Sequence, residues 1–176
     1  MKAMAVVAHP DDCVIFAYSF IHNHPEYAWT ICYLTYAEWE PRAQEFRQFW
    51  NRRNVPTIFL GYRDDYRDIE NKKISFDEAQ ARKEIGGIIS NYDLILTHNE
   101  QGDYGHLHHV FVNQATAGHP YRVTFAGPGQ GTVKYSVESG CYSLEELPLH
   151  RDIVSSFHQH AHTNEYAVSN RVKNIL

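Results

Sequence analysis

Two short segments of the chain bring histidine and aspartate residues together. Residues Ala8–Asp12 read Ala-His-Pro-Asp-Asp, and residues Gly105–His109 read Gly-His-Leu-His-His. A catalytic zinc ion takes three protein ligands of this kind, imidazole nitrogens or carboxylate oxygens, and keeps one position for water. The ion lowers the pKa of that water to about 7, so a neighbouring carboxylate can take its proton. The two segments therefore predict a metal-dependent hydrolytic site.

The spacing of the histidines in the second segment allows them to have different roles in catalysis. His106 and His109 are three positions apart, and side chains with this spacing face the same way on one helical turn. One imidazole can then bind the metal, while the other supports a developing oxyanion or protonates a leaving amine. The alternative is that Asp11 and Asp12 cap a helix, where aspartate is favoured, and that the histidines are solvated. The presence of both segments favours the metal site.

The stretches that must position these segments alternate between apolar runs and amphipathic runs. Short apolar runs, rich in β-branched or aromatic residues, predict strands. The predicted strands are Lys2–Val7, Trp29–Thr35, Thr57–Leu60, Leu94–Thr97, Val123–Ala126 and Thr132–Val137, with Gly127–Gly131 as a turn between the last two.

Longer stretches with apolar residues at helical spacing lie between the strands. Ser75–Glu78 is typical of a capping box that opens a helix, and Gly118 is typical of a helix end. Residues 62–74 are polar, and we interpret them as an excursion over the surface. The predicted helices are Asp12–Ile21, Glu38–Arg53, Ser75 to about Ser90, His106–Ala117, and a last helix from Pro148 to about His160.

The alternation of strands and helices predicts an α/β fold, a Rossmann-like three-layer sandwich with a mostly parallel central sheet. A chain of 176 residues favours one domain, so we assign residues 1–176 to a single domain. Ligands of such sheets bind beyond the carboxyl ends of the strands. His9 follows the first predicted strand, and His106 follows the loop after the fourth. Both segments are therefore predicted at the same edge of the sheet.

Composition restricts the partners and the compartment. The net charge of -5 and the pI of about 6.2 argue against nucleic acid or an anionic membrane as a partner, because both require a cationic face. No apolar run reaches the roughly 20 residues of a transmembrane segment, and the start lacks a full signal-peptide apolar region. We therefore expect a cytoplasmic protein. The turn after the first strand lacks Gly-x-Gly-x-x-Gly, which argues against a nucleotide-binding module.

The chain also resembles a known family. Ala-His-Pro-Asp-Asp after the first strand, with a later Tyr-Gly-His-x-x-His, resembles the LmbE/PIG-L-like zinc de-N-acetylases. The resemblance extends over roughly residues 4–112 and is weak beyond them. It implies removal of an N-acetyl group from an N-acetylglucosamine-type substrate, so that the partner is a small amino sugar or glycoconjugate. Further similar positions follow in the family's order, namely Arg42-x-x-Glu45, Phe59–Asp64, Thr97–Asn99 and Gly102–His106.

The resemblance implies a role for each matching residue of the metal centre. His9, Asp12 and His109 match the metal ligands, and Asp11 matches the general base that activates the water. The implied metal is Zn2+, although two imidazoles and a carboxylate also suit other divalent metals such as Fe2+. The three cysteines are far apart in the chain, which favours neither a disulfide framework nor a thiolate site.

Three further residues match positions that face the substrate. His106 matches the imidazole near the carbonyl and the leaving group, Tyr104 matches a mobile tyrosine near the oxyanion, and Arg42 matches a residue that contacts substrate. The chain is short for the family. We therefore expect a more open cleft, or one that a second subunit completes in a homo-oligomer.

Two positions depart from the family pattern. Cys13 stands where the family has glutamate, and His108 stands where it has aspartate. The family's aspartate holds the substrate-facing imidazole, and a histidine can replace its hydrogen bond but not its fixed charge. We therefore expect a lower pKa for His106 than an aspartate at position 108 would give. His98 can line the cleft. The later histidines are interpreted as surface or packing residues, namely His150, His158, His160 and His162.

Two alternatives stay open at this point. The substrate can be another amide, such as a thiol-conjugate. The chain can also be a metal-binding or sugar-binding protein that has lost catalytic tuning at position 108. The retained Asp11 argues against this second alternative, because a pure binding site needs no unligated carboxylate beside its metal.

Overall fold

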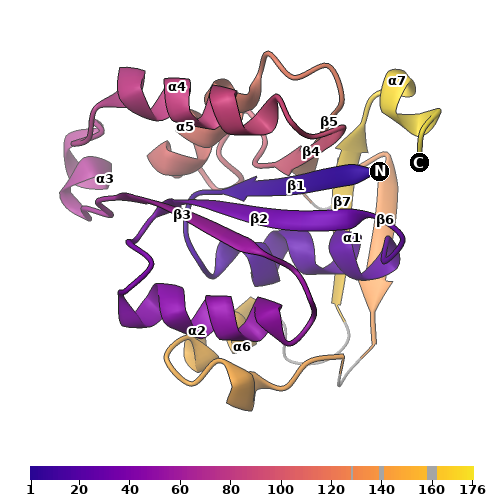
Figure 1. Cartoon of the computed structure of the whole chain (residues 1–176), viewed down its shortest axis with the longest axis horizontal. Coiled ribbons are helices and arrows are strands. Elements are labelled where there is room, and N and C mark those ends of the chain that lie inside the picture. The colour runs from indigo at the N-terminus through magenta and orange to yellow at the C-terminus, as the bar shows by residue number, and fades with distance from the viewer. Residues whose placement is uncertain (128, 139–140, 158–161) are drawn as a thin grey trace.

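The computed structural model describes residues 1–127, 129–138, 141–157 and 162–176. Its centre is a seven-stranded sheet with the strand order β3-β2-β1-β4-β5-β7-β6, and helices cover both faces (Figure 1). This arrangement confirms the predicted α/β sandwich with a mostly parallel sheet. The strands are β1 (Lys2–Val7), β2 (Ala28–Thr35), β3 (Thr57–Tyr62), β4 (Leu94–Thr97), β5 (Arg122–Ala126), β6 (Val133–Val137) and β7 (His162–Val168).

The helices fall between the strands and after the last one. Among the residues that the structure describes, every helix is too short or too polar to cross a bilayer. The helical segments are η1 (Cys13–Ala17), α1 (Tyr18–Asn23), α2 (Pro41–Asn51), α3 (Arg67–Asn71), α4 (Glu78–Ile89), α5 (Leu107–Thr116), η2 (Leu144–Glu146), α6 (Arg151–Phe157) and α7 (Asn170–Lys173).

The central strand β1 is apolar and buried from Ala3 to Val7 because both of its faces are covered. Ala3, Ala5 and Val7 enter one hydrophobic core, to which α1, α2 and α6 contribute. Met4 and Val6 point the other way, into a core shared with α4 and α5. The two groups of helices lie on opposite sides of the sheet (Figure 1). Such continuous apolar strands are typical of parallel sheets that are buried on both faces.

The order of the strands reverses at β1, and this reversal brings the two histidine segments together. β1 pairs in parallel with β2 on one side and with β4 on the other. Val6 is in register with Thr97, so β1 and β4 end side by side. The segment after β1 and the loop after β4 therefore leave the sheet at one point, where ligands of such sheets bind.

The last part of the sheet differs from the prediction. β5 and β6 are strands as predicted, but they do not pair with each other, because β7 lies between them and is antiparallel to both. β7 was not predicted, since polar residues interrupt its apolar ones. Tyr166 and Val168 are its buried hydrophobic residues within the described chain. Residue 128 of the predicted turn and residues 158–161, where the last helix was predicted to end, lie outside the described residues.

Several helix boundaries also differ from the prediction. The first helix begins as a π-helical turn and continues to Asn23. α2 begins at Pro41, whose fixed backbone suits a first helical position. Trp39, predicted on this helix, precedes it and is 78% exposed. α4 is capped by Asp77, whose carboxylate accepts the N–H of Gln80, so the cap lies two residues after the predicted one.

The segment that follows β6 is attached to α2 by a cluster of charged and aromatic side chains. Arg53 donates hydrogen bonds of 3.0 Å to both carboxylate oxygens of Glu146 on η2. The guanidinium carbon of Arg53 also stacks 3.8 Å from the centre of the Phe49 ring. The hydrogen bonds from Arg53 lower the pKa of Glu146 to about 2, against partial burial. This contact fixes the start of the segment that carries His150.

This ion pair should give a stability difference that depends on pH. Glu146→Gln should lower the free energy of unfolding at pH 7 by about 0.5–1 kcal/mol, the range of partly exposed ion pairs. The folded-state pKa of Glu146 lies below its unfolded value of about 4.3. The ion pair therefore stabilises the folded protein fully above about pH 4.3, and this stabilisation is lost as the pH falls toward 2.

Urea denaturation at pH 7 and pH 3 measures the effect, and the gap between wild type and variant should shrink at pH 3. Glu145→Gln is the control, because Glu145 is an exposed neighbour of the same charge. A gap of equal size and equal pH dependence for both variants would contradict the assignment.

Candidate functional site

Three side chains from different elements meet beyond the carboxyl ends of β1 and β4. His9 follows β1, Asp12 immediately precedes η1, and His109 lies on the first turn of α5. His9 Nδ1 lies 3.2 Å from Asp12 Oδ2 and 3.3 Å from His109 Nε2. The distance between Asp12 Oδ2 and His109 Nε2 is 3.2 Å. The structure thus brings together the three residues that the sequence predicts as metal ligands.

These three donor atoms have the spacing that a small divalent metal requires. Ligands placed about 2.0–2.1 Å from a tetrahedral zinc ion are roughly 3.3–3.4 Å from one another, close to the observed separations of 3.2 and 3.3 Å. All three residues are buried. Burial opposes ionisation of Asp12, but His109 and His9 hold the pKa of its carboxyl well below the usual range. Two imidazoles and a charged carboxylate therefore fit a divalent metal.

A second carboxylate, Asp103, orients two histidines from behind. Its Oδ2 lies 2.9 Å from His109 Nδ1 and also accepts a hydrogen bond from His98 Nδ1. Because Nδ1 of His109 is turned to Asp103, its Nε2 faces Asp12. His98 is completely buried, and its Nε2 accepts the N–H of Ala8 at 3.0 Å. His98 therefore supports the segment of His9 and the candidate metal centre from inside the protein.

Asp11 is the neighbour of Asp12 but turns toward α2. Its carboxylate is buried, and its Oδ1 accepts a hydrogen bond of 3.4 Å from Arg42 Nη2. Burial and the charge of Asp12 raise the pKa of Asp11, and Arg42 opposes this shift. A buried carboxylate with a raised pKa, next to a candidate metal centre, is suited to taking a proton.

His106 stands at the N-cap of α5, on the more open side of the site. Its Nδ1 accepts the backbone N–H of His108 at 3.2 Å, which leaves the proton of a neutral ring on Nε2. Burial and the neighbouring imidazoles lower the pKa of His106 to about 3. The neutral ring can donate a hydrogen bond from Nε2. Tyr104 is 63% exposed, and its ring centre lies 6.0 Å from that of His106.

Arg42 is held in place by side chains from three other segments. Its Nε donates a hydrogen bond of 2.6 Å to His150 Nε2, and its Nη1 donates to the hydroxyl of Tyr36. His150 is fixed in turn, because its Nδ1 donates to the carboxylate of Glu45. With its contact to Asp11, this network orients the guanidinium beside the candidate base. His150 is thus a buried packing residue that contacts the site.

Sequence reasoning missed several members of this environment. Tyr36 directly follows β2, and Asp64 follows β3 by two residues, so both leave the sheet at the edge that carries His9. The rule that identified His9 would also have identified these two. The Tyr36 hydroxyl donates to Asp64 Oδ2 at 2.8 Å. Asp68 lies within residues 62–74, which were predicted as surface, but it is buried on α3.

His108 lies in a different place from the one expected. Its Nδ1 is 3.2 Å from His9 Nε2, and its Nε2 is 3.0 Å from Asp68 Oδ2. The expectation that its side chain is a hydrogen-bond partner of His106 is therefore wrong, since His106 accepts the backbone N–H of His108 instead. The reason is local. His106 is an N-cap residue with an extended backbone, so it precedes the helical face that presents His108.

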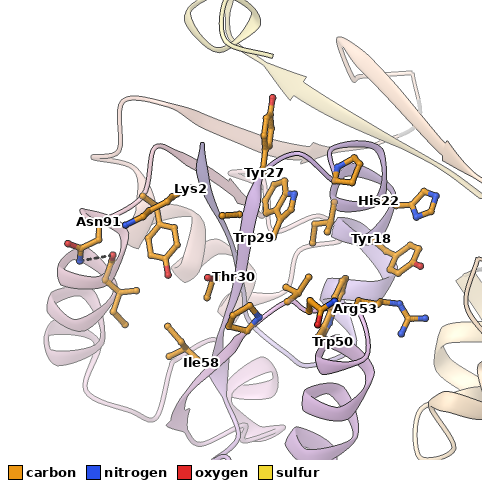
Figure 2. Close-up of a pocket in the computed structure, with 18 of the residues that line it drawn as sticks. Lys2, Tyr18, His22, Tyr27, Trp29, Thr30, Trp50, Arg53, Ile58 and Asn91 are labelled. Carbon is orange, nitrogen blue, oxygen red and sulfur yellow. Dashed lines mark hydrogen bonds between the residues drawn. The ribbon is translucent and has the colours of Figure 1, made fainter.

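The structure also contains a large pocket at the opposite edge of the sheet. Figure 2 shows that Lys2, Trp29 and Trp50 line it, at or near the amino ends of the strands and on α2. Its volume is about 1270 Å³. None of the predicted site residues contributes to its lining. The chemistry of the histidine segments therefore lies at the other edge.

Comparison with known sequences identifies a family. Residues 4–118 match the family PIG-L, described as GlcNAc-PI de-N-acetylase. A curated relative, uncharacterized protein L374 of Acanthamoeba polyphaga mimivirus, is 25% identical over 129 residues. The matched region is 63% of this chain and 54% of the relative, so the chain spans about half the length of that relative.

Comparison with solved structures identifies the fold. N,N'-diacetylchitobiose deacetylase from Pyrococcus horikoshii has a TM-score of 0.58 at 16% identity, covering 98% of this chain and 73% of that one. A deacetylase from the biosynthesis pathway of teicoplanin has a TM-score of 0.58 at 11% identity, with 97% and 99% covered. GalB, the 4-carboxy-2-hydroxymuconate hydratase from Pseudomonas putida KT2440, has a TM-score of 0.56 at 13% identity, with 90% and 77% covered. Because deacetylases and a hydratase share the fold, the fold alone does not name the reaction.

The loop before α5 depends on a glycine with a left-handed backbone. Gly102 has a φ of +72°, and its carbonyl oxygen accepts the N–H groups of Tyr104, Gly105 and His106. A Cβ atom at Gly102 would lie 2.6 Å from the carbonyl oxygen of His106. Gly105 also has a positive φ, +92°, but a Cβ atom there would meet nothing within 4 Å. A side chain at either position would strain the backbone, but only one at Gly102 would also overlap with neighbouring atoms.

Alanine at the two positions should affect stability to different extents. Gly105→Ala should cost about 1–2 kcal/mol of unfolding free energy, which is the backbone penalty for a left-handed residue. Gly102→Ala should cost about 1–3 kcal/mol more, because the overlap forces the backbone to move. Urea denaturation of both variants measures the difference. Equal losses for the two variants would show that the loop has no tight packing at Gly102.

Proposed function

Because the chain belongs to the PIG-L family of de-N-acetylases, we propose that it is a metal-dependent hydrolase that removes an N-acetyl group from an amino sugar or a related glycoconjugate. The observation that carries the proposal is the triangle of donor atoms from His9, Asp12 and His109, with separations of 3.2, 3.3 and 3.2 Å. A buried carboxylate, Asp11, lies beside this triangle. A binding protein would not need that second carboxylate.

In this proposal, His9 Nδ1, Asp12 Oδ2 and His109 Nε2 hold the metal. Zn2+ suits a set of two imidazoles and one carboxylate, and Fe2+ suits the same set. When bound, the ion polarises the acyl carbonyl and lowers the pKa of water. The protein's own contribution is to keep the three donor atoms close together, which the hydrogen bond from His109 to Asp103 supports.

The remaining residues act on the proton, the oxyanion and the substrate. Asp11 takes the proton of the attacking water, for which its burial and raised pKa are suited, and this proton then passes to the leaving amine as the C–N bond breaks. His106 stabilises the oxyanion as a neutral donor, since its Nδ1 is engaged by a backbone N–H and its proton is on Nε2. Arg42 orients Asp11 and contacts the substrate. Tyr104 is exposed beside His106 and completes the oxyanion side.

The structures of similar fold guide the choice of substrates. One is a deacetylase of N,N'-diacetylchitobiose and another is a deacetylase of the teicoplanin pathway, so the acceptor differs among them. The assay should therefore follow acetate release from a panel of N-acetyl amino sugars and their lipid, thiol and nucleotide conjugates, with a defined metal present. Release from an N-acetyl amino sugar supports the proposal. Acetate release confined to the thiol conjugates identifies another amide as the substrate.

Metal content tests the ligand set directly. His9→Ala, Asp12→Ala and His109→Ala should each reduce bound metal sharply, because every change removes one of three donors. Elemental analysis of the purified proteins measures the loss, and circular dichroism confirms the fold. A chelator should abolish acetate release by the wild type, and added metal should restore it. Stoichiometric metal in the double variant His9→Ala, His109→Ala would overturn the ligand assignment.

The role of Asp11 predicts a different pattern. Asp11→Asn should keep the metal and the fold but lose activity by about 10²–10⁴-fold, the contribution of a general base. Steady-state kinetics together with elemental analysis measure both properties. Asp152→Asn, an exposed change on α6, is the control and should leave the rate unchanged. Loss of metal in Asp11→Asn would make Asp11 a ligand, and full activity would remove it from the mechanism.

A further inference from the structure

His108 occupies a position between His9 and a carboxylate from α3. It is 1% exposed. Its Nδ1 lies 3.2 Å from His9 Nε2, and its Nε2 lies 3.0 Å from Asp68 Oδ2. The other nitrogen of His9, Nδ1, faces Asp12 and His109. The His9 ring thus has one nitrogen for the candidate metal, and its other nitrogen has His108 Nδ1 as the nearer partner at 3.2 Å and Asp64 Oδ1 at 3.5 Å.

The protons of this chain of side chains can be assigned from their partners. A neutral imidazole that offers the lone pair of Nδ1 carries its proton on Nε2. His9 Nε2 then needs an acceptor, and His108 Nδ1 is at hydrogen-bond distance. His108 can accept at Nδ1 because its own proton is on Nε2, where the Asp68 carboxylate accepts it. Each donor in the chain therefore meets an acceptor.

The partner of His109 provides a direct comparison. His109 uses Nε2 toward Asp12 and donates from Nδ1 to the carboxylate of Asp103 at 2.9 Å. Histidines that bind metals usually donate their second ring N–H to such an acceptor, which fixes the tautomer and the ring orientation. His9 has the same arrangement with one imidazole inserted, because His108 lies between its ring and Asp68.

We propose that His108 and Asp68 are positioning residues, which hold His9 in the tautomer and orientation needed to bind the metal through Nδ1. The inference rests on the proposed function in one respect, that His9 is a metal ligand. It also gives α3 a role. The Asp68 carboxylate accepts hydrogen bonds from both the N–H and the hydroxyl of Ser75, at 3.1 and 3.2 Å, so the segment after β3 is closed around it.

A second metal is the competing interpretation of the same atoms. His9 Nε2, His108 Nδ1 and Asp64 Oδ1 are 3.2, 3.5 and 3.7 Å apart in pairs, close enough to surround an ion. His9 would then have to lose both ring protons and bridge two metals. The hydrogen-bonded chain to Asp68 requires no such deprotonation, and it accounts for the orientation of the His108 ring. The structure therefore favours positioning.

Two substitutions of His108 separate the alternatives. The amide oxygen of Asn in His108→Asn can accept at the place of Nδ1 and preserve the hydrogen bond from His9. His108→Gln instead places its amide near Nε2, and loses that acceptor. Asp68→Ala removes the anchor, whereas Ser75→Ala is the control, because it removes one hydrogen bond to Asp68 but leaves the contact to His108. Competition with a chelating dye measures the affinity of each protein for Zn2+, and circular dichroism monitors the fold.

His108→Gln and Asp68→Ala should weaken Zn2+ binding by about 10–100-fold, the usual effect of losing such a partner. His108→Asn and Ser75→Ala should stay within about 3-fold of the wild type. Equal affinities for His108→Gln and His108→Asn would overturn the inference. Two Zn2+ ions per wild-type chain would overturn it in favour of the second metal. Wild-type protein that binds no Zn2+ at this site would instead contradict the proposed function.

A measurement on the wild type keeps the test independent of how well the variants fold. Two-bond 1H–15N correlation spectra of the Zn2+-loaded protein report which ring nitrogen of each histidine carries the proton. His9 and His108 should both be protonated on Nε2. A proton on Nδ1 of His108 would remove the nearer acceptor for His9 Nε2, leave only Asp64 Oδ1, and overturn the inference.

Discussion

The buried carboxylate of Asp12 is the interaction on which the rest of the site depends. A charge without partners in the protein interior is very unfavourable, and Asp12 is 3% exposed. Its Oδ2 accepts the backbone N–H of His9 at 2.7 Å and lies 3.2 Å from ring nitrogens of both His9 and His109. Burial disfavours a charged His9, but Asp12 outweighs burial and raises the pKa of His9 to about 9. These partners come from two distant parts of the chain, so β1 and β4 must be neighbours for the charge to be compensated.

Much of the fold could be predicted because the central strands are buried on both faces. Their sequences are nearly continuous apolar runs, and Val7 and Thr97 mark where two of them end. The position of the histidine segments followed from those two ends. β7 could not be predicted in the same way, since polar residues interrupt its two buried hydrophobic residues and one of them, Asn164, shares their face and hydrogen-bonds to Ser19. Asp68 could not be predicted either, because its partner His108 lies 40 positions away and the local sequence contains no trace of that contact.

The histidine at position 108 acts on a different residue from the one that the sequence predicted. A residue between His106 and His109 was expected to act on His106. The backbone of His106 is extended, with ψ at 127°, and the helix begins only after it. The side chain of residue 108 therefore points to the other side of the site and reaches His9. The carboxylate that contacts the far nitrogen of this imidazole is that of Asp68 on α3.

The part of the chain beyond the family match contributes to the site in a different way. Residues 4–118 contain the three proposed metal ligands together with Asp11 and His106. Arg42 lies within this region, but its orientation depends on His150, which lies outside it. His150 is in turn held by Glu45, and its segment is attached to α2 through Glu146 and Arg53. The family match therefore includes every residue of the proposed metal centre. Arg42, the proposed contact to the acceptor, is oriented by a segment outside the family match, so the choice of acceptor has to be studied with that segment present.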